Sequence, residues 1–309
     1  MKALSIKNLK KTYSNSNQAL KGIDLTVEAG DFYALLGPNG AGKTTAIGIV
    51  SSLVNKSGGE VEVFGHSIDT ELEAAKACIG VVPQEVNLNL WDTVGNIVTN
   101  QAGYYGLGGK LARQRAEQYL RALRLWDRRD DIARSLSGGM KRRLMIARAL
   151  VHEPRLLILD EPTACVDIEI RRSMWEFLQE INAAGTTIIL TTHYLEEAES
   201  LCRHIAIIDE GTIIEDARMS DVLRKLQREV FVLSITAELD EAPSLEGFKT
   251  RIRASGELEV EKGPDRDLND LFNELSERGI HVSSLRNKAN RLEELFMRLV
   301  ENKQQGHAG

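Results

Sequence analysis

The chain has 309 residues, of which 42% are hydrophobic and 27% charged, a composition typical of a globular protein with one large and one small domain or two medium ones. Its formal net charge of -6 argues against nucleic acid as the main partner. We expect no secretion signal and no membrane span, and the three scattered cysteines, Cys78, Cys165 and Cys202, indicate a reducing compartment.

The first part of the chain predicts four strands, with one helix between the second and the third. Polar and apolar residues alternate over 23–27 as in a half-buried strand, and the apolar run 31–36 predicts a strand that ends at Gly37. The expected elements are strands over 23–27, 31–36, 58–66 and 79–82 and a helix from about 43 to 54.

Residues 85–153 have no strand pattern and predict a helical subdomain inserted into an α/β core, with helices near 92–105 and 110–124. Strands are then expected over 156–159, 187–190, 205–208 and 212–214. Because helical segments separate the first three of these strands, we expect a mainly parallel sheet.

A change of composition after Ala217 predicts a second, smaller domain. A strand is expected over 229–236, and apolar residues at helical spacing predict helices over 268–275 and 292–299. We therefore divide the chain into a nucleotide-binding domain over 1–219 and a small α+β accessory domain over 220–309.

A glycine-rich segment between the strand at 31–36 and the following helix matches the full phosphate-loop pattern. In such loops the backbone N–H groups point at one phosphate chain, the lysine reaches the β- and γ-phosphates, and the Thr44 hydroxyl binds Mg²⁺. A plain glycine turn is disfavoured by the strand–loop–helix context. The expected ATP-binding residues here are Gly37, Pro38, Asn39, Gly40, Ala41, Gly42, Lys43, Thr44 and Thr45.

The segment "RLLILDEP" predicts the catalytic half of the same site. Asp160 follows a buried strand and can reach the Mg²⁺ shell, and Glu161 is suited to deprotonate a water aimed at the γ-phosphorus. Such an acidic pair is often only a helix cap, but the phosphate loop favours the catalytic interpretation.

Four further motifs resemble the nucleotide-binding subunits of ABC transporters over at least residues 3–215. The segment 136–140, "LSGGM", resembles the ABC signature; Gln84 is similar to the Q-loop glutamine, His193 to the switch histidine, and Tyr13 to the aromatic residue that stacks on adenine. The resemblance implies a P-loop NTPase core of the ABC-ATPase type, with an antiparallel β subdomain and the inserted helical subdomain.

In this family the signature of one subunit covers the γ-phosphate bound by another, in a head-to-tail dimer that holds two ATP molecules. The resemblance thus assigns Ser137, Gly138, Gly139 and Asp167 to the partner's site. It also implies catalytic roles for Gln84 and His193 beside Glu161 and Lys43, and Mg²⁺ contacts from Thr44, Gln84 and Asp160. From position alone, Gln84 could be a surface glutamine and Tyr13 a core aromatic.

Two positions depart from the family pattern. Met140 stands where many members have glutamine, which matters little if backbone N–H groups hold the phosphate. Cys165 stands where a glycine usually precedes the aspartate at 167, and a cysteine in a left-handed conformation costs about 1 kcal/mol. We expect lower ATPase activity than in a Cys165→Gly variant.

The details of these motifs look most like ABC-2-type exporters, with the bacterial YadG-like ATPase subunits as the most similar group. The resemblance implies a separate polytopic permease as partner, a second copy of the chain, and a place on the cytoplasmic face of the inner membrane. Leu88, Leu90, Trp91, Tyr104 and Tyr105 then belong to the groove that grips the permease, or else pack the helical subdomain. The alternative is a soluble ABC ATPase that is not coupled to transport. A GTPase is excluded because no NKxD motif exists.

Overall fold

The computed structural model describes residues 1–163, 167–192, 194–225, 230–236, 239, 241–253, 255–263 and 266–287. The chain divides into two compact units, Met1–Met219 and Ser220–Gly309, and each is described by itself. Among the described residues, no helix combines the length and the apolar character that crossing a bilayer requires.

A six-stranded sheet with the order β10-β9-β3-β8-β7-β6 forms the centre of the first unit. Its strands are β3 (Phe32–Leu36), β6 (Ile79–Val82), β7 (Leu156–Asp160), β8 (Thr187–Thr192), β9 (His204–Asp209) and β10 (Thr212–Arg218). All neighbours are parallel except the antiparallel pair of β9 and β10. Every residue of β3, β7 and β8 is buried, as expected for parallel strands that are covered on both faces.

A second, antiparallel sheet with the order β2-β1-β4-β5 completes the β structure of this unit. It consists of β1 (Lys2–Thr12), β2 (Gln18–Glu28), β4 (Gly58–Val63) and β5 (His66–Ser67). Along β2, buried Ile23, Leu25 and Val27 alternate with exposed residues, which confirms the predicted half-buried strand. The buried residues join side chains of the central sheet and of α1 in one hydrophobic core.

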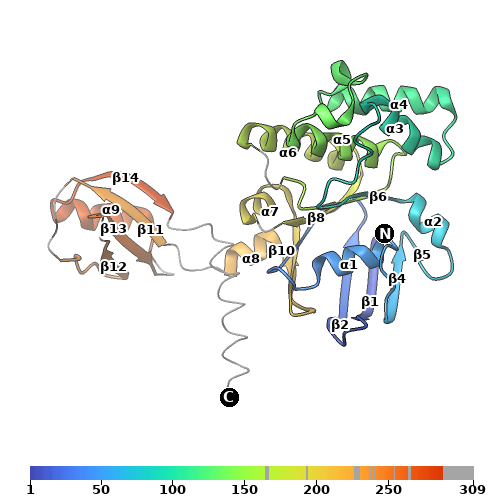
Figure 1. Ribbon diagram of the computed structural model, residues 1–309. Helices are drawn as coiled ribbons and strands as arrows, with labels where there is room; N and C mark the ends of the chain where they lie inside the picture. Colours follow the sequence, from blue (N-terminus) through green and yellow to red (C-terminus); the bar gives the residue numbers. More distant parts are fainter. Residues whose placement is uncertain are drawn as a thin grey trace. The chain divides into compact units, whose positions relative to one another are not determined.

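Helices cover the central sheet and form the inserted subdomain. The helices of this part are α1 (Lys43–Val50), α2 (Leu72–Ala77), α3 (Val94–Tyr104), α4 (Gly109–Ala122), α5 (Gly138–Leu150), α6 (Ile168–Ala183) and α7 (Leu195–Leu201), with short 3₁₀ turns at Trp126–Arg128 and Ala133–Ser135. Helix α8 (Met219–Lys225) begins at the last residue of this unit and otherwise belongs to the second unit. Helices α3, α4 and α5 lie on one side of the central sheet, and β1, β2 and β4 lie on the other (Figure 1).

The helix expected from about 43 to 54 ends four residues early, at Val50. Ser52 adopts a left-handed backbone with φ 59°, and the N–H groups of Leu53 and Val54 both donate to the Gly48 carbonyl. This pattern satisfies the last carbonyls of the helix and turns the chain away, so the apolar residues beyond Val50 belong to a loop.

The second unit is a small α+β domain. Its antiparallel sheet has the order β12-β13-β11-β14, from β11 (Val230–Ile235), β12 (Phe248–Ile252), β13 (Leu258–Lys262) and β14 (Val282–Asn287). Helix α9 (Leu268–Glu277) starts with a reciprocal capping box between Asp267 and Asp270, and Leu271 and Leu275 pack into the core of this unit. The helix expected over 292–299 lies outside the described residues.

Candidate functional site

The phosphate loop, residues 37–44, links the end of β3 to the start of α1. At two positions of this loop the space and backbone conformation exclude any residue with a side chain. A Cβ on Gly37 would lie 2.2 Å from the Ile208 carbonyl oxygen, and a Cβ on Gly42, whose φ is 111°, would lie 2.7 Å from the Ala19 oxygen. Close packing on β9 and β2 therefore fixes the loop in a shape that only glycine allows at these two positions.

Lys43 points its ammonium group back into this loop. Nζ donates to the Gly37 carbonyl at 2.6 Å and to the Pro38 carbonyl at 3.0 Å. Burial lowers the pKa of Lys43, while Glu161 and Asp160 act in the opposite direction. A buried cation held by weakly basic carbonyls has much to gain from an anionic ligand, which is the role expected for this lysine.

A pocket of about 430 Å³ opens beside the loop and gathers most of the predicted ATP-binding residues. Its described lining residues are Tyr13, Asn17, Ala19, Asn39, Gly40, Ala41, Gly42, Lys43, Thr44, Thr45, Gln84 and Glu161. Tyr13 is 38% exposed and so is not a core aromatic. Its hydroxyl lies 3.2 Å from Thr45 Oγ1, and Lys11 Nζ lies 4.8 Å from its ring centroid, which holds the ring at the rim of the pocket.

The acidic pair lies at the carboxyl end of β7, and strand register explains its surroundings. Asp160 pairs with Thr191 of β8, whose hydroxyl donates to Asp160 Oδ1. The Glu161 N–H donates to the Thr191 carbonyl at 3.0 Å. Val82 of β6 pairs with Leu159, so Gln84 comes beside Glu161, and its Nε2 donates to Glu161 Oε2 at 3.1 Å. Two predicted catalytic residues, 77 positions apart, are thus in direct contact.

The residues expected to bind Mg²⁺ have the right chemistry. Thr44 and Gln84 line the pocket, and Asp160 is next to Glu161. The Thr191 hydroxyl donates to Oδ1 of Asp160, and Gln84 donates to Glu161 through its side-chain nitrogen. The side-chain oxygen of Gln84 is not engaged by this hydrogen bond. Hydroxyl, amide and carboxylate oxygens are the ligands that Mg²⁺ prefers. Among the described residues there is no cluster of three acidic, His or Cys side chains. At nucleotide sites, phosphate oxygens and water supply most ligands of Mg²⁺.

The signature lies at the start of α5. Ser137 is the N-cap, and its Oγ accepts the Met140 N–H at 3.3 Å. Ser137 and Gly138 are exposed, and no residue of 136–139 is among the described lining residues of the pocket. Asp167 is exposed at the start of α6. The residues predicted to serve the partner's site are thus not among the described lining residues of this pocket. His193 and Cys165 lie outside the described residues.

The five expected groove residues differ in exposure, and Leu88 and Leu90 are half-buried. Trp91 is 71% exposed, with the Arg134 guanidinium 4.7 Å from its ring centroid, and Tyr104 is exposed as well. Tyr105 instead stacks on His152 with ring centroids 3.6 Å apart. Burial lowers the pKa of His152 to about 4, so this stack is a neutral packing contact. Trp91 and Tyr104 thus remain available to a partner, whereas Tyr105, although 36% exposed, stacks on His152 of the helical subdomain.

Two residues of the site were not identified from the sequence. Thr191 holds both Asp160 and the Glu161 N–H, and Arg142 of α5 donates to the Glu161 carbonyl. A threonine at the carboxyl end of the strand next to β7 was a usable signal for Thr191. The contact of Arg142 depends on tertiary packing, which no local pattern predicts.

Known proteins with a similar sequence or fold identify the family of this chain. The ABC transporter family matches residues 20–164. The linearmycin resistance ATP-binding protein LnrL of Bacillus subtilis (strain 168) is 35% identical over 310 residues, which cover 96% of this chain and 98% of that protein. The daunorubicin/doxorubicin resistance ATP-binding protein DrrA of Streptomyces peucetius is 37% identical over 234 residues, 76% of this chain and 71% of that protein.

Among solved structures, the ATP-binding cassette MJ0796, a dimer in a post-hydrolysis state bound to ADP and Pi, has a TM-score of 0.65 and 27% identity. The similarity covers 70% of this chain and 98% of that one. Together with the phosphate loop, the acidic pair and the contact between Gln84 and Glu161, these matches show that the chain belongs to the ATP-binding subunits of ABC transporters and is an ATPase.

Proposed function

We propose that the chain powers an ABC-2-type exporter by forming a head-to-tail homodimer around two ATP molecules and hydrolysing them. One observation carries this proposal: the pocket is lined by the phosphate loop, Gln84 and Glu161, while the signature, with Ser137 and Gly138 exposed, is not among its described lining residues. An anion-binding helix start that faces solvent is useful when a second chain brings a phosphate to it.

Hydrolysis needs a base, and Glu161 is the candidate. Its carboxylate would take a proton from a water aimed at the γ-phosphorus, and Gln84, hydrogen bonded to that carboxylate, would orient it. The N–H group of Glu161 is fixed by Thr191, so the carboxylate starts from a rigid backbone. Mg²⁺, held by Thr44, Gln84 and Asp160, would neutralise charge on the phosphate oxygens.

Lys43 would contribute to both binding and catalysis. In this structure its ammonium group bonds to two carbonyls of the phosphate loop. Exchanging them for phosphate oxygens replaces neutral acceptors with charged ones, which form stronger hydrogen bonds. The same charge would stabilise the transferred phosphoryl group in the transition state.

Transport requires a permease, and the helical subdomain offers a surface for it. Trp91, just before the start of α3, and Tyr104, at its end, are both exposed, and aromatic side chains of this kind anchor protein interfaces. The chain would then sit on the cytoplasmic face of the inner membrane through its permease. LnrL and DrrA are named for resistance to linearmycin and to daunorubicin/doxorubicin, which favours a drug as cargo.

The experiment is a pull-down of the Glu161→Gln protein from detergent-solubilised membranes of the native cell with ATP and Mg²⁺, followed by mass spectrometry. The matched control is the Lys43→Ala, Glu161→Gln double variant, which lacks the lysine that holds the phosphates. A polytopic permease recovered with the single variant supports the proposal. Recovery of ribosomes or other soluble assemblies without a permease would instead support an ABC ATPase that is not coupled to transport.

A further inference from the structure

Arg142 joins three functional segments that are distant in sequence. It lies in the first turns of α5 and is only 6% exposed. Its Nη1 donates to the Pro83 carbonyl at 2.6 Å, and its Nη2 donates to the Gln84 carbonyl at 3.0 Å and the Glu161 carbonyl at 2.8 Å. A single guanidinium thus connects the signature helix to the Q-loop backbone and to the backbone of the catalytic glutamate.

The bond to Glu161 acts on a strained residue. Glu161 has φ 49°, in the left-handed region, which costs about 1 kcal/mol or more for a residue with a side chain. Such a backbone persists only where its surroundings hold it from several sides. Thr191 holds the N–H of Glu161, and Arg142 holds its carbonyl oxygen. The orientation of the catalytic carboxylate therefore depends on the position of the Arg142 guanidinium group.

Arg142 is also mechanically continuous with the signature. Ser137 is the N-cap of α5, and its carbonyl accepts the N–H of Lys141, the residue before Arg142. Residues bonded within one or two turns of a helix move together. A displacement of the signature on contact with a partner's nucleotide would therefore displace Arg142 as well.

We propose that Arg142 is a positioning residue that transmits the state of the signature, which serves the partner's nucleotide, to Glu161 and Gln84 of its own site. The inference rests on the proposed head-to-tail dimer. Closure of the signature over one nucleotide then sets the catalytic groups that act on the other, so the two ATP molecules are hydrolysed in a coupled way.

Arg148 provides a matched comparison. It lies on the same helix and holds the same loop further along, donating to the Asn87 carbonyl at 3.0 Å and to Asn87 Oδ1 at 2.6 Å. Its described hydrogen bonds do not include Glu161. An Arg148→Gln variant loosens the Q-loop segment and removes one positive charge without releasing the glutamate.

The test measures ATPase kcat, KM and the Hill coefficient for Arg142→Gln, Arg142→Lys and Arg148→Gln. We expect Arg142→Gln to lower kcat by about 10- to 100-fold through misplacement of the base, with KM changed less than about threefold. Arg142→Lys keeps the charge but reaches fewer carbonyls, so its kcat should be intermediate. Arg148→Gln should retain kcat within about threefold. Thermal unfolding of each variant shows that it is folded.

A double-mutant cycle with Ser137→Ala tests the transmission itself. If Arg142 carries the signal, Ser137→Ala lowers kcat strongly in the parent and at least about threefold less in the Arg142→Gln background. If the fold-losses in kcat of the two single variants simply multiply in the double variant, the inference is overturned. It is also overturned if Arg142→Gln retains the parental kcat. The dimer is assayed separately, with ATP and the Glu161→Gln protein. A monomer in that assay refutes the proposed function and this inference with it. Failure of the double-mutant cycle alone refutes only this inference.

Discussion

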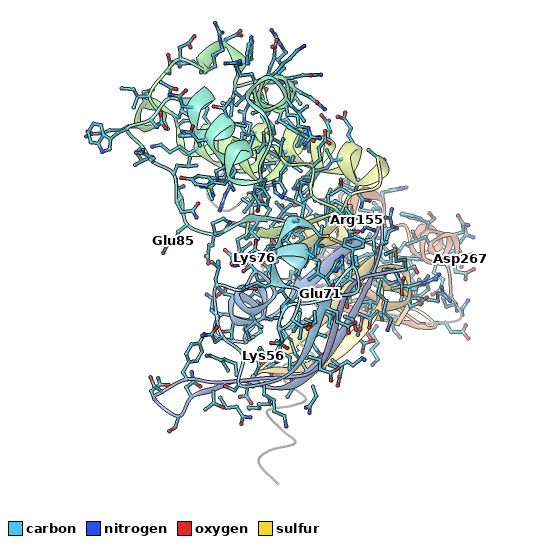
Figure 2. The ribbon with its side chains drawn as sticks, turned by 90° about the vertical axis from the view of Figure 1, so that its right-hand side faces the viewer. Lys56, Glu71, Lys76, Glu85, Arg155 and Asp267 are labelled. Atoms are coloured by element: carbon cyan, nitrogen blue, oxygen red, sulfur yellow. The ribbon has the colours of Figure 1, made fainter. Side chains whose placement is uncertain are left out.

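The side-chain amide of Gln84 donates to the carboxylate of Glu161 across 3.1 Å. Gln84 begins the segment that leads from the central sheet to the helical subdomain, and the neighbouring Glu85 marks this segment in Figure 2. Glu161 directly follows β7, whose last residue is Asp160. If the helical subdomain moves, this one hydrogen bond would carry the movement directly to the carboxylate that we propose as the catalytic base.

Substitutions of Gln84 should therefore act on kcat. Gln84→Ala removes a bond worth about 0.5–1.5 kcal/mol, so we expect kcat to fall by about two- to tenfold. Gln84→Glu should cost more, because a like charge repels the carboxylate of Glu161. Steady-state phosphate release measures both, with the exposed Glu85→Gln as the control. Equal loss in the alanine and glutamate variants would contradict the account of this contact.

Tyr13 should contribute to ATP affinity through its ring. Tyr13→Ala removes a stacking surface worth about 0.5–1.5 kcal/mol, so KM for ATP should rise by about two- to tenfold with little change in kcat. Tyr13→Phe keeps the ring and loses only the contact of the hydroxyl with Thr45, and its KM should stay close to the parental value. Similar KM values in the alanine and phenylalanine variants would show that the ring does not bind the nucleotide.

Trp91 should couple ATP hydrolysis to transport. Replacing Leu90 and Trp91 by alanine removes apolar area from the surface proposed to bind the permease, and none of the pocket lining changes. We expect basal ATPase activity within about twofold of the parent and a loss of transport by the complex reconstituted in vesicles. Leu53→Ala, at an apolar side chain that is 77% exposed after α1, is the control and should transport normally. Normal transport by the Leu90→Ala, Trp91→Ala variant would refute the groove assignment.

Glu197 predicts a pH dependence of stability. It is fully buried on α7, and its Oε1 accepts from Thr163 at 2.8 Å and from Trp175 at 3.0 Å. Burial raises the pKa of Glu197, although these hydrogen bonds and the charge of Arg171 oppose the shift. The folded chain therefore holds this proton more tightly than the unfolded chain. The stabilisation that the protonated Glu197 carboxyl gives the folded chain is fully present at low pH. It is lost as the pH rises above the ordinary glutamate pKa of about 4.3.

Glu197→Gln keeps the oxygen that accepts both bonds and removes the buried charge. The Tm of this variant relative to the parent should therefore increase between about pH 4.5 and pH 7.5. Glu196→Gln, at the exposed neighbouring position, should show no such trend. Differential scanning calorimetry across this range checks the sign, and a Tm difference that declines with pH would be the opposite of what burial requires.

The parts of the fold and site that local chemistry determines could be predicted from the sequence. The phosphate loop needs its glycines at fixed spacing, and the strands at 79–82 and 156–159 are short apolar runs between clear boundaries, so both were predicted at nearly their observed positions. The end of α1 was not, because residues 51–54 are mostly compatible with a helix and the turn depends on two bonds to the Gly48 carbonyl.

The contacts within the site could not be predicted from the sequence, because they depend on the order of the strands in the sheet. Gln84 and Glu161 meet because β6 and β7 are parallel neighbours with Val82 opposite Leu159, which the sequence does not specify. Thr191 reaches Asp160 for the same reason, from the other side of β7. Arg142 looks in the sequence like one more basic residue of an exposed helix, and only packing brings it to three carbonyls.

The central claim is that two copies of this chain close around ATP with the signature of each over the phosphate loop of the other. The most direct measurement is light scattering coupled to size-exclusion chromatography of the Glu161→Gln protein, with ATP and Mg²⁺ and again with ADP. We expect a dimer with ATP and a monomer with ADP, and loss of the ATP dimer in the Ser137→Glu variant, whose bulky side chain would block the signature. A Glu161→Gln protein that remains monomeric at saturating ATP would contradict it.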